Sequence, residues 1–324
     1  IESSQYAIGV FCDLSKAFDT LNHEILLRKL DHYGIRGKAN MWFRSYLADR
    51  RQYVELNSKR SSTLQLPTGV PQGSILGPLL FLIYINDLPS AAANLKCVSF
   101  ADDSNFITQG SDLAILTKSL TKELEHISDF FKANQLKLNA QKTKMVIFRK
   151  KRLPLNHQDM NVYLEGVKLS HDDSAEFLGI TIDSTLSWDK HCSNIANKIS
   201  RNNGMLNRVK HMLPPCSLRL LYHSFIQPHI QYGIPAWGGC SAQNKKRVVS
   251  IQKRAIRTIT TSYITAHTEP RVKKLGLLKF DDLYKIECMS LVHDCVHGNA
   301  PDNIESGLQL AISSEHNLRN QVEN

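Results

Sequence analysis

The stretch Phe100-Ala101-Asp102-Asp103 places two adjacent aspartates between two short apolar segments, residues 95–100 and 105–108. Both segments are predicted to be strands, so the aspartates lie where a hairpin turns. Adjacent carboxylates repel each other, and a divalent cation that neutralises them makes the arrangement tolerable. For an isolated pair, an ordinary solvated turn is the stronger interpretation. The neighbouring sequence decides between a metal site and a solvated turn.

A third carboxylate follows another predicted buried strand. The apolar run Tyr6–Cys12 leads directly into Asp13. Three carboxylates at the ends of adjacent strands would hold two Mg²⁺ ions through oxygen ligands. Two such ions, ~3.5–4 Å apart, stabilise the attacking and leaving oxygens of a phosphoryl transfer. The sequence therefore offers a two-metal site if the fold brings Asp13 to the hairpin.

The other elements up to residue 185 are mixed, whereas the pattern after Trp188 is almost wholly helical. We therefore expect a domain boundary near residue 186. Helices are predicted over 23–34, 41–47, from Pro78 onward and over 113–131. Strands are predicted over 51–56 paired with 62–66, then 144–148, 162–164 paired with 167–169, and 177–182.

Composition excludes several classes of protein. The 324 residues are 42% hydrophobic and 22% charged, which is ordinary for a globular protein and argues against disorder. The longest apolar run, near residues 79–85, is far shorter than the ~20 residues of a membrane span. The seven cysteines are widely spaced and form no CxxC pair, so we expect free thiols in a reducing compartment, the nucleus and cytoplasm.

Basic residues exceed acidic ones by 40 to 30, for a net charge of +10, which suits a polyanionic partner. On a helix, Lys246, Lys253 and Arg257 share a narrow sector, with Arg247 and Arg254 beside them. Apolar residues fill the other side. This pattern predicts a surface that follows a nucleic-acid backbone, although a solvated face fits it equally well.

Five ordered motifs resemble the palm of a reverse transcriptase from a non-LTR, LINE-type and jockey-like retrotransposon. They are Asp13–Asp19 (DLSKAFD), Thr68–Pro78 (TGVPQGSILGP), Phe100–Asp103 (FADD), Leu136–Thr143 (LKLNAQKT) and Phe177–Gly179 (FLG). The resemblance implies an α+β fold. Residues 1–185 would form a polymerase palm with an antiparallel sheet flanked by helices and with truncated fingers, and residues 186–324 an all-α thumb and C-terminal region. We expect the chain to be a piece of a longer protein.

The resemblance also implies roles for individual residues. Asp13 and Asp102 would bridge the metal ions, and Asp103 would complete the metal site. Lys142 would protonate the leaving pyrophosphate. The segment beneath the incoming triphosphate would be Leu14, Ser15, Lys16 and Ala17. Phe18 would lie under the sugar and exclude a 2′-hydroxyl. Gln72 and Gly73 would contact the template and nascent base pair, and Phe177, Leu178 and Gly179 would grip the primer end.

The implied function is RNA-directed DNA synthesis with two Mg²⁺ ions, Mn²⁺ being an alternative. The partners would be an RNA template, a DNA primer and deoxynucleoside triphosphates, with no membrane. A second interpretation belongs to a different class: a catalytically inactive remnant that binds nucleic acid through its basic surfaces. The intact trio of aspartates favours the enzyme, and the truncated fingers favour the remnant.

Overall fold

The structure, a computed structural model, describes residues 5–153, 155, 160–301 and 304. The chain divides into two compact units. The first comprises residues 1–177 and 183–186, and the second residues 178–182 and 187–324. Residues 178–182 thus belong with the helical unit, although they precede the boundary that the change of pattern suggests.

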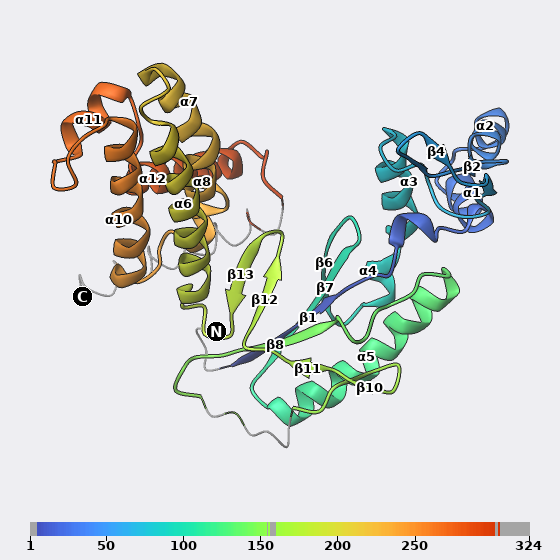
Figure 1. Cartoon of the computed structure of the whole chain (residues 1–324). Helices are drawn as coiled ribbons and strands as arrows, with labels where there is room; N and C mark the ends of the chain where they lie inside the picture. The colour runs from blue at the N-terminus through green and yellow to red at the C-terminus, as the bar shows by residue number, and fades with distance from the viewer. Residues whose placement is uncertain (1–4, 154, 156–159, 302–303, 305–324) are drawn as a thin grey trace. The chain divides into compact units, whose positions relative to one another are not determined.

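The first unit is built on a five-stranded sheet with the order β11-β8-β1-β7-β6. Strand β1 is central and pairs antiparallel with β7 on one side and β8 on the other, whereas the short β11 runs parallel to β8. Helix α5 runs alongside the sheet strands in Figure 1. The elements are β1 (Tyr6–Cys12), β6 (Lys96–Phe100), β7 (Asp103–Gly110), α5 (Leu113–Ala133), β8 (Lys144–Phe148) and β11 (Ser170–His171).

The core of the first unit explains why these residues form a sheet covered by a helix. Ile8 and Val10 of β1 are fully buried, and they share one hydrophobic core with Leu120, Leu124 and Ile127 of α5. Successive residues of β1 are buried, as the apolar run in the sequence predicts, and the buried residues of α5 recur every three to four positions. The predicted strand 6–12 and helix 113–131 are confirmed.

A group of short elements separates β1 from β6. The predicted pairing of 51–56 with 62–66 is confirmed in outline, but it consists of two nested pairs, β2 with β5 and β3 with β4. The helix expected from Pro78 begins slightly earlier, at Leu76. The elements are η1 (Ala17–Asp19), α1 (His23–His32), α2 (Lys38–Leu47), β2 (Arg51–Gln52), β3 (Glu55–Leu56), β4 (Lys59–Arg60), β5 (Leu64–Gln65), α3 (Leu76–Ile85) and α4 (Leu88–Ala91).

The hairpin predicted around Gly166 is confirmed as β9 (Tyr163–Leu164) and β10 (Val167–Lys168). The single strand predicted over 177–182 is wrong. The chain forms a second hairpin there, from β12 (Ser174–Phe177) to β13 (Ile180–Asp183). Its turn residues Leu178 and Gly179 both have positive φ, 47° and 76°. Two left-handed residues in succession make the tight turn that joins twisted antiparallel strands.

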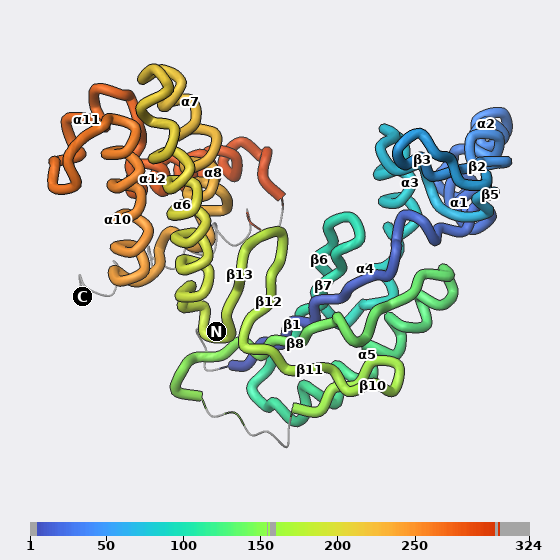
Figure 2. Tube along the Cα trace, viewed as in Figure 1, coloured from blue at the N-terminus to red at the C-terminus, as the bar shows by residue number. Residues whose placement is uncertain are grey.

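The second unit is helical, as predicted for the residues after Trp188. Helices α6 and α10 pack against each other and lie side by side in Figure 2. Trp237, Tyr222 and Phe280 are fully buried in its core. The helices are α6 (Asp189–Val209), α7 (Pro215–Phe225), α8 (Gln227–Gln231), α9 (Ile234–Trp237), α10 (Ala242–Ile259), α11 (Glu269–Leu275) and α12 (Phe280–Val296). Throughout the described residues, no helix combines the length and hydropathy that crossing a bilayer requires.

Candidate active site

Strand register brings the three aspartates together. In the hairpin of β6 and β7, Phe100 pairs with Asp103, which leaves Ala101 and Asp102 as the turn. Cys12 of β1 pairs with Ser104, so one further step along the same register sets Asp13 opposite Asp103. Directly opposed residues of an antiparallel pair have Cβ atoms ~4.5–5.5 Å apart. Carboxylates separated by about ninety positions in the sequence therefore meet at one end of the sheet.

The Asp103 carboxyl lies close enough to the other two carboxylates for their charges to act on it. Burial raises the pKa of the Asp103 carboxyl, and the negative charges of Asp102 and Asp13 raise it further. A bound cation would relieve this repulsion, and carboxylate oxygens are the ligands that Mg²⁺ takes. Within the part of the chain that the structure describes, no three acidic, histidine or cysteine side chains converge closely enough to mark a metal site.

A second chain segment fixes Lys142 beside Asp13. Residues 137–139 run along residues 13–15: the amide of Asn139 donates to the carbonyl of Asp13, and that of Ser15 to the carbonyl of Lys137, both at 2.9 Å. Three residues later, Lys142 Nζ lies 3.9 Å from Asp13 Oδ2. Its side chain is largely exposed to solvent. The structure thus brings Lys142 and Asp13, two of the predicted site residues, to one place.

These groups line a pocket of about 290 Å³ in the first unit. Asp13, Asp103 and Lys142 contribute to its wall, whereas Asp102 does not. The sequence analysis did not single out Glu176, Asn105 or Lys144, which also line it. Lys144 is engaged with Asp172 at 3.0 Å. The full lining is Phe11, Cys12, Asp13, Asp103, Asn105, Lys142, Lys144, Ala175, Glu176 and Phe177.

The segment after Asp13 divides between core and surface. Leu14 and Ala17 are buried, so their side chains belong to the core, and Lys16 is exposed with φ of 51°. Phe18 is half-buried, with its ring 4.7 Å from that of Phe81. The Phe81 ring thus packs against the Phe18 ring, and the rest of the Phe18 side chain is partly accessible to solvent.

The loop before α3 docks onto this segment. The amides of Val70 and Gly69 donate to the carbonyls of Phe18 and Leu21, at 2.9 and 2.8 Å. A Cβ atom on Gly69 would lie 2.7 Å from the carbonyl oxygen of Asp19, so only glycine allows this approach. Gln72 is held in turn, because its Nε2 donates to Asp19 Oδ1 at 2.7 Å.

A basic pocket of about 620 Å³ lies at this junction. Lys16, Arg50 and Arg51 line it beside Gln72, and Arg50 also donates to the carbonyl of Gly69 at 2.8 Å. The exposed Gly73 is next in sequence but does not line it. The sequence analysis missed Arg50 and Arg51, because only the loop docking brings them to Gln72. The remaining lining residues are Asp19, Gln52, Leu66, Thr68, Gly69, Val70 and Pro71.

The turn of the second hairpin, which carries Leu178 and Gly179, is held by the helical unit. Tyr232 donates its hydroxyl hydrogen to the Leu178 carbonyl at 2.7 Å. The amide of Thr181 donates to His191 Nδ1 at 3.2 Å. Burial lowers the pKa of His191 to about 4, so its ring is neutral at pH 7. Tyr232 is a supporting residue that the sequence analysis did not identify as such.

The five cations predicted to follow a nucleic-acid backbone differ in their surroundings. Lys246, Lys253 and Arg254 are exposed on α10. Arg247 instead donates to Ser193 Oγ at 2.6 Å, and Arg257 donates to the carbonyl of Ala266 at 2.8 Å. The helix therefore offers three cations to solvent, and the other two also stabilise their own unit.

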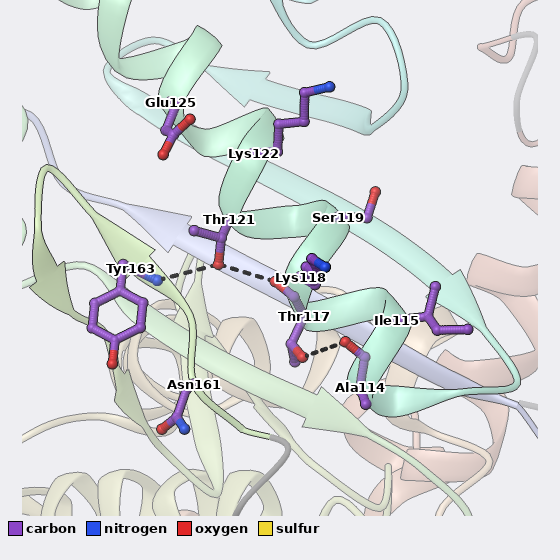
Figure 3. A pocket seen from close by; sticks show the side chains of 10 residues that line it. All are labelled: Ala114, Ile115, Thr117, Lys118, Ser119, Thr121, Lys122, Glu125, Asn161 and Tyr163. Carbon is purple, nitrogen blue, oxygen red and sulfur yellow. Dashed lines mark hydrogen bonds between the residues drawn. The ribbon is translucent and has the colours of Figure 1, made fainter.

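A wider groove, of about 860 Å³, lies along α5 and away from the carboxylates in sequence and lining. Figure 3 shows side chains of one α5 face, among them Lys118 and Lys122, with Asn161 and Tyr163 across from them. Thr121 Oγ1 accepts from the amide of Tyr163 at 3.4 Å and closes one side. None of the predicted site residues lines this groove, so its size does not make it the active site.

Residues 2–182 match the family described as reverse transcriptase (RNA-dependent DNA polymerase). The chain belongs to this family. Reverse transcriptases generally use divalent metal ions. The family and the mixed sheet-and-helix architecture of the first unit are consistent with a palm-type fold. The resemblance predicted from the five motifs is confirmed.

Similar proteins come from non-LTR retrotransposons. The chain is 25% identical to the RNA-directed DNA polymerase from mobile element jockey of Drosophila melanogaster, over 87% of this chain and 31% of that protein. It is 30% identical to the probable RNA-directed DNA polymerase from transposon BS of the same species, over 80% and 29%. The chain thus spans about a third of these relatives. Among solved structures, apo telomerase from Candida tropicalis aligns over 84% of this chain and 43% of that one, with a TM-score of 0.43 and 14% identity.

Proposed function

We propose that this chain carries the polymerase centre of an RNA-directed DNA polymerase from a non-LTR retrotransposon. It extends the 3′-hydroxyl of a DNA primer with deoxynucleoside triphosphates along an RNA template. The observation that carries the proposal is the convergence of Asp13, Asp102 and Asp103 at one sheet end, with Lys142 Nζ 3.9 Å from Asp13. Family membership supports it.

The carboxylates of Asp13, Asp102 and Asp103 are the residues that would hold two Mg²⁺ ions, with Mn²⁺ as an alternative. When bound, such ions stabilise the charge that develops on the attacking and leaving oxygens. In the reaction, the primer 3′-hydroxyl would lose its proton to solvent, and its oxygen would form a bond to the α-phosphorus while the bond from that phosphorus to the β-phosphate oxygen breaks. Lys142 Nζ gives a proton to the departing pyrophosphate.

The remaining predicted residues position the substrates. The backbone of residues 14–17 lies beneath the triphosphate, and Phe18, braced by Phe81, excludes a ribose 2′-hydroxyl. Gln72 and Gly73 meet the template and the nascent base pair. Lys16, Arg50 and Arg51 make the pocket beside Gln72 suitable for phosphates of the template or nucleotide. Phe177, Leu178 and Gly179 hold the primer end.

A primer-extension assay on poly(rA) annealed to oligo(dT) tests this function. Asp102→Asn keeps the shape of the side chain and removes its charge. We expect incorporation to fall at least ~100-fold, equivalent to ~2.7 kcal/mol of transition-state stabilisation. Asp129→Asn, an exposed α5 position, is the matched control and should leave incorporation unchanged.

Two outcomes would contradict the proposal. Equal incorporation by the wild type and Asp102→Asn would exclude catalysis at this site. Absence of incorporation by the wild type with added Mg²⁺ or Mn²⁺, together with salt-sensitive binding of the same duplex, would favour the inactive remnant.

A further inference from the structure

A small basic pocket lies in the second unit, far along the chain from the aspartates. Its volume is about 300 Å³, and helices α6 and α10 with the loop that follows α10 form its walls. The pocket is lined by Ser200, Asn203, Gly204, Asn207, Lys210, Arg254, Arg257, Thr258, Ser262 and Ile264. Hydroxyl, amide and cationic groups dominate this lining, which is unusual for a gap between two packed helices.

All charged residues that line the pocket are cationic. Lys210, Arg254 and Arg257 contribute three cations, and no acidic residue contributes to the wall. Arg257 is held in place by its bond to the Ala266 carbonyl. Among the described residues, the Lys210 ammonium and the Arg254 guanidinium have neither an ion pair nor a hydrogen-bond partner. Three neighbouring cations without a counter-charge favour an anionic ligand.

Asn203 is a second and independent sign of a missing ligand. Its residue is only 4% exposed, and its Oδ1 has no hydrogen-bond partner in the described part of the chain. A buried polar atom without a partner is costly, so native proteins rarely keep one without a reason. Rotation of the amide by 180° exchanges oxygen and nitrogen at the same point. The amide can therefore donate to an anion.

The helix leaves room at the same place. Gly204 follows Asn203, and a Cβ atom there would meet nothing within 4 Å. Glycine within a helix is unfavourable relative to alanine, because it loses more conformational freedom on folding. Its presence beside Asn203 keeps the wall of the pocket open to a ligand of the size of a phosphate.

We propose that this pocket binds one backbone phosphate of the template–primer duplex, with Asn203 donating from its amide and Lys210, Arg254 and Arg257 supplying the positive charge. The inference rests on the proposed function for the identity of the duplex. Lys246 and Lys253 are further exposed cations of α10 outside the pocket, and Lys253 lies close enough to Glu269 to lower the pKa of that carboxyl.

The test measures binding of a fluorescent RNA–DNA hybrid by anisotropy between 50 and 300 mM NaCl. Asn203→Asp keeps the side-chain shape and places a negative charge in the pocket. We expect its affinity at 100 mM salt to fall at least tenfold and its plot of log K against log[salt] to become shallower by about 0.9, the loss of one phosphate contact. Asn197→Asp is the matched control: the same charge change on α6, about 9 Å earlier along the axis. It should shift affinity less than threefold.

A second pair keeps the test valid if Asn203→Asp unfolds. Arg254→Gln removes an exposed cation of the pocket, and Arg201→Gln removes an exposed α6 cation outside it. The proposal expects the shallower salt slope only for Arg254→Gln. Equal effects of the two variants within each pair would overturn the proposal. It would also be overturned if inorganic phosphate at 10 mM displaced the hybrid while the slope of log K against log[salt] stayed unchanged, because the site would then bind free phosphate. Asp102→Asn loses incorporation without losing this binding, so failure of the catalytic proposal is distinguished from failure of this one.

Discussion

Lys142 Nζ lies 3.9 Å from Asp13 Oδ2, although 129 positions separate the two residues in the sequence. The contact follows from backbone pairing: Leu14 and Leu138 form a bridge, and Asn139 Oδ1 accepts from the amide of Lys142 at 3.3 Å. The turn that carries Lys142 is therefore held at one end by the segment that follows β1 and at the other by the pairing of Lys144 with Phe11 of β1. A cation is held at the carboxylates without being buried by them.

This arrangement predicts the effect of replacing Lys142. If its ammonium protonates the leaving pyrophosphate, Lys142→Gln should slow single-turnover incorporation by ~10²–10⁴-fold. Rapid-quench rates at saturating deoxynucleoside triphosphate would show this. Lys144→Gln is the control, because Lys144 lines the same pocket but pairs with Asp172. A Lys142→Gln enzyme that keeps the wild-type single-turnover rate would exclude the role.

The docked loop predicts unequal costs at two glycines. Gly69 and Gly73 both have positive φ, 81° and 86°, but only at Gly69 would a Cβ atom meet backbone. Gly73→Ala should cost about 1 kcal/mol of unfolding free energy from the left-handed backbone alone. Gly69→Ala should cost at least about 2 kcal/mol more, or release the loop. Urea denaturation with limited proteolysis of residues 66–74 measures both, and equal costs would contradict the docking described for Gly69.

Two other glycines should respond with opposite signs. Gly179 has φ of 76° in the second hairpin, so Gly179→Ala should destabilise the protein by ~1–2 kcal/mol. Gly204 lies within α6 in open space, so Gly204→Ala should stabilise it by ~0.5–1 kcal/mol. Thermal melts of the two variants, followed by circular dichroism, provide the comparison. A stabilising Gly179→Ala would rule out the left-handed turn.

His191 predicts an acid-sensitive stability. The folded protein keeps the ring neutral down to pH about 4, because burial lowers its pKa and Nδ1 accepts from the Thr181 amide. The unfolded chain takes up that proton near pH 6.5. Between these values the unfolded state binds more protons, so stability falls as the pH falls from 6.5 to 4, by at most about 3 kcal/mol from this residue. The stability above pH 6.5 is unaffected.

Chemical denaturation at pH 7.5, 6, 5 and 4 measures this dependence. His191→Asn is the informative variant, because its amide oxygen can accept from the Thr181 amide without taking up a proton. Its stability should fall less steeply with acid than that of the wild type. Parallel curves for the two proteins would show that His191 does not contribute.

Much of this fold could be predicted because its strongest signals are local. The continuous apolar run of β1 indicates a buried strand, and the spacing of leucines in α5 describes one buried helix face. The failure at 177–182 has a physical cause: Phe177 to Ile182 is mostly apolar, and its sequence does not indicate that a leucine, Leu178, adopts a left-handed conformation. The hydrogen bond that supports this turn comes from Tyr232, the residue after α8 and 54 positions further along the chain.

The residues of the candidate site also fall into two groups: those that the sequence predicts and those that only tertiary packing reveals. The three aspartates could be proposed because each lies in a motif at the end of a predicted strand. Strand register then sets Asp13 opposite Asp103, with Asp102 in the adjoining turn. Arg50 and Arg51 could not be proposed, because they reach the pocket of Gln72 only through the docking of the loop at Gly69. Asn203 gave no sequence signal at all. A polar residue in a helix is ordinary until packing buries it without a partner.

The central position of β1 has a consequence for synthesis on the ribosome. This strand is made before both of its neighbours, β7 and β8, which end at Gly110 and Phe148. Pairings between such distant segments lose much chain entropy and form slowly. The apolar strand β1 therefore stays incompletely paired in the nascent chain until residue 148 has been translated. A binding chaperone would act in that interval, and a stop codon anywhere before residue 148 would leave β1 as an aggregation-prone edge.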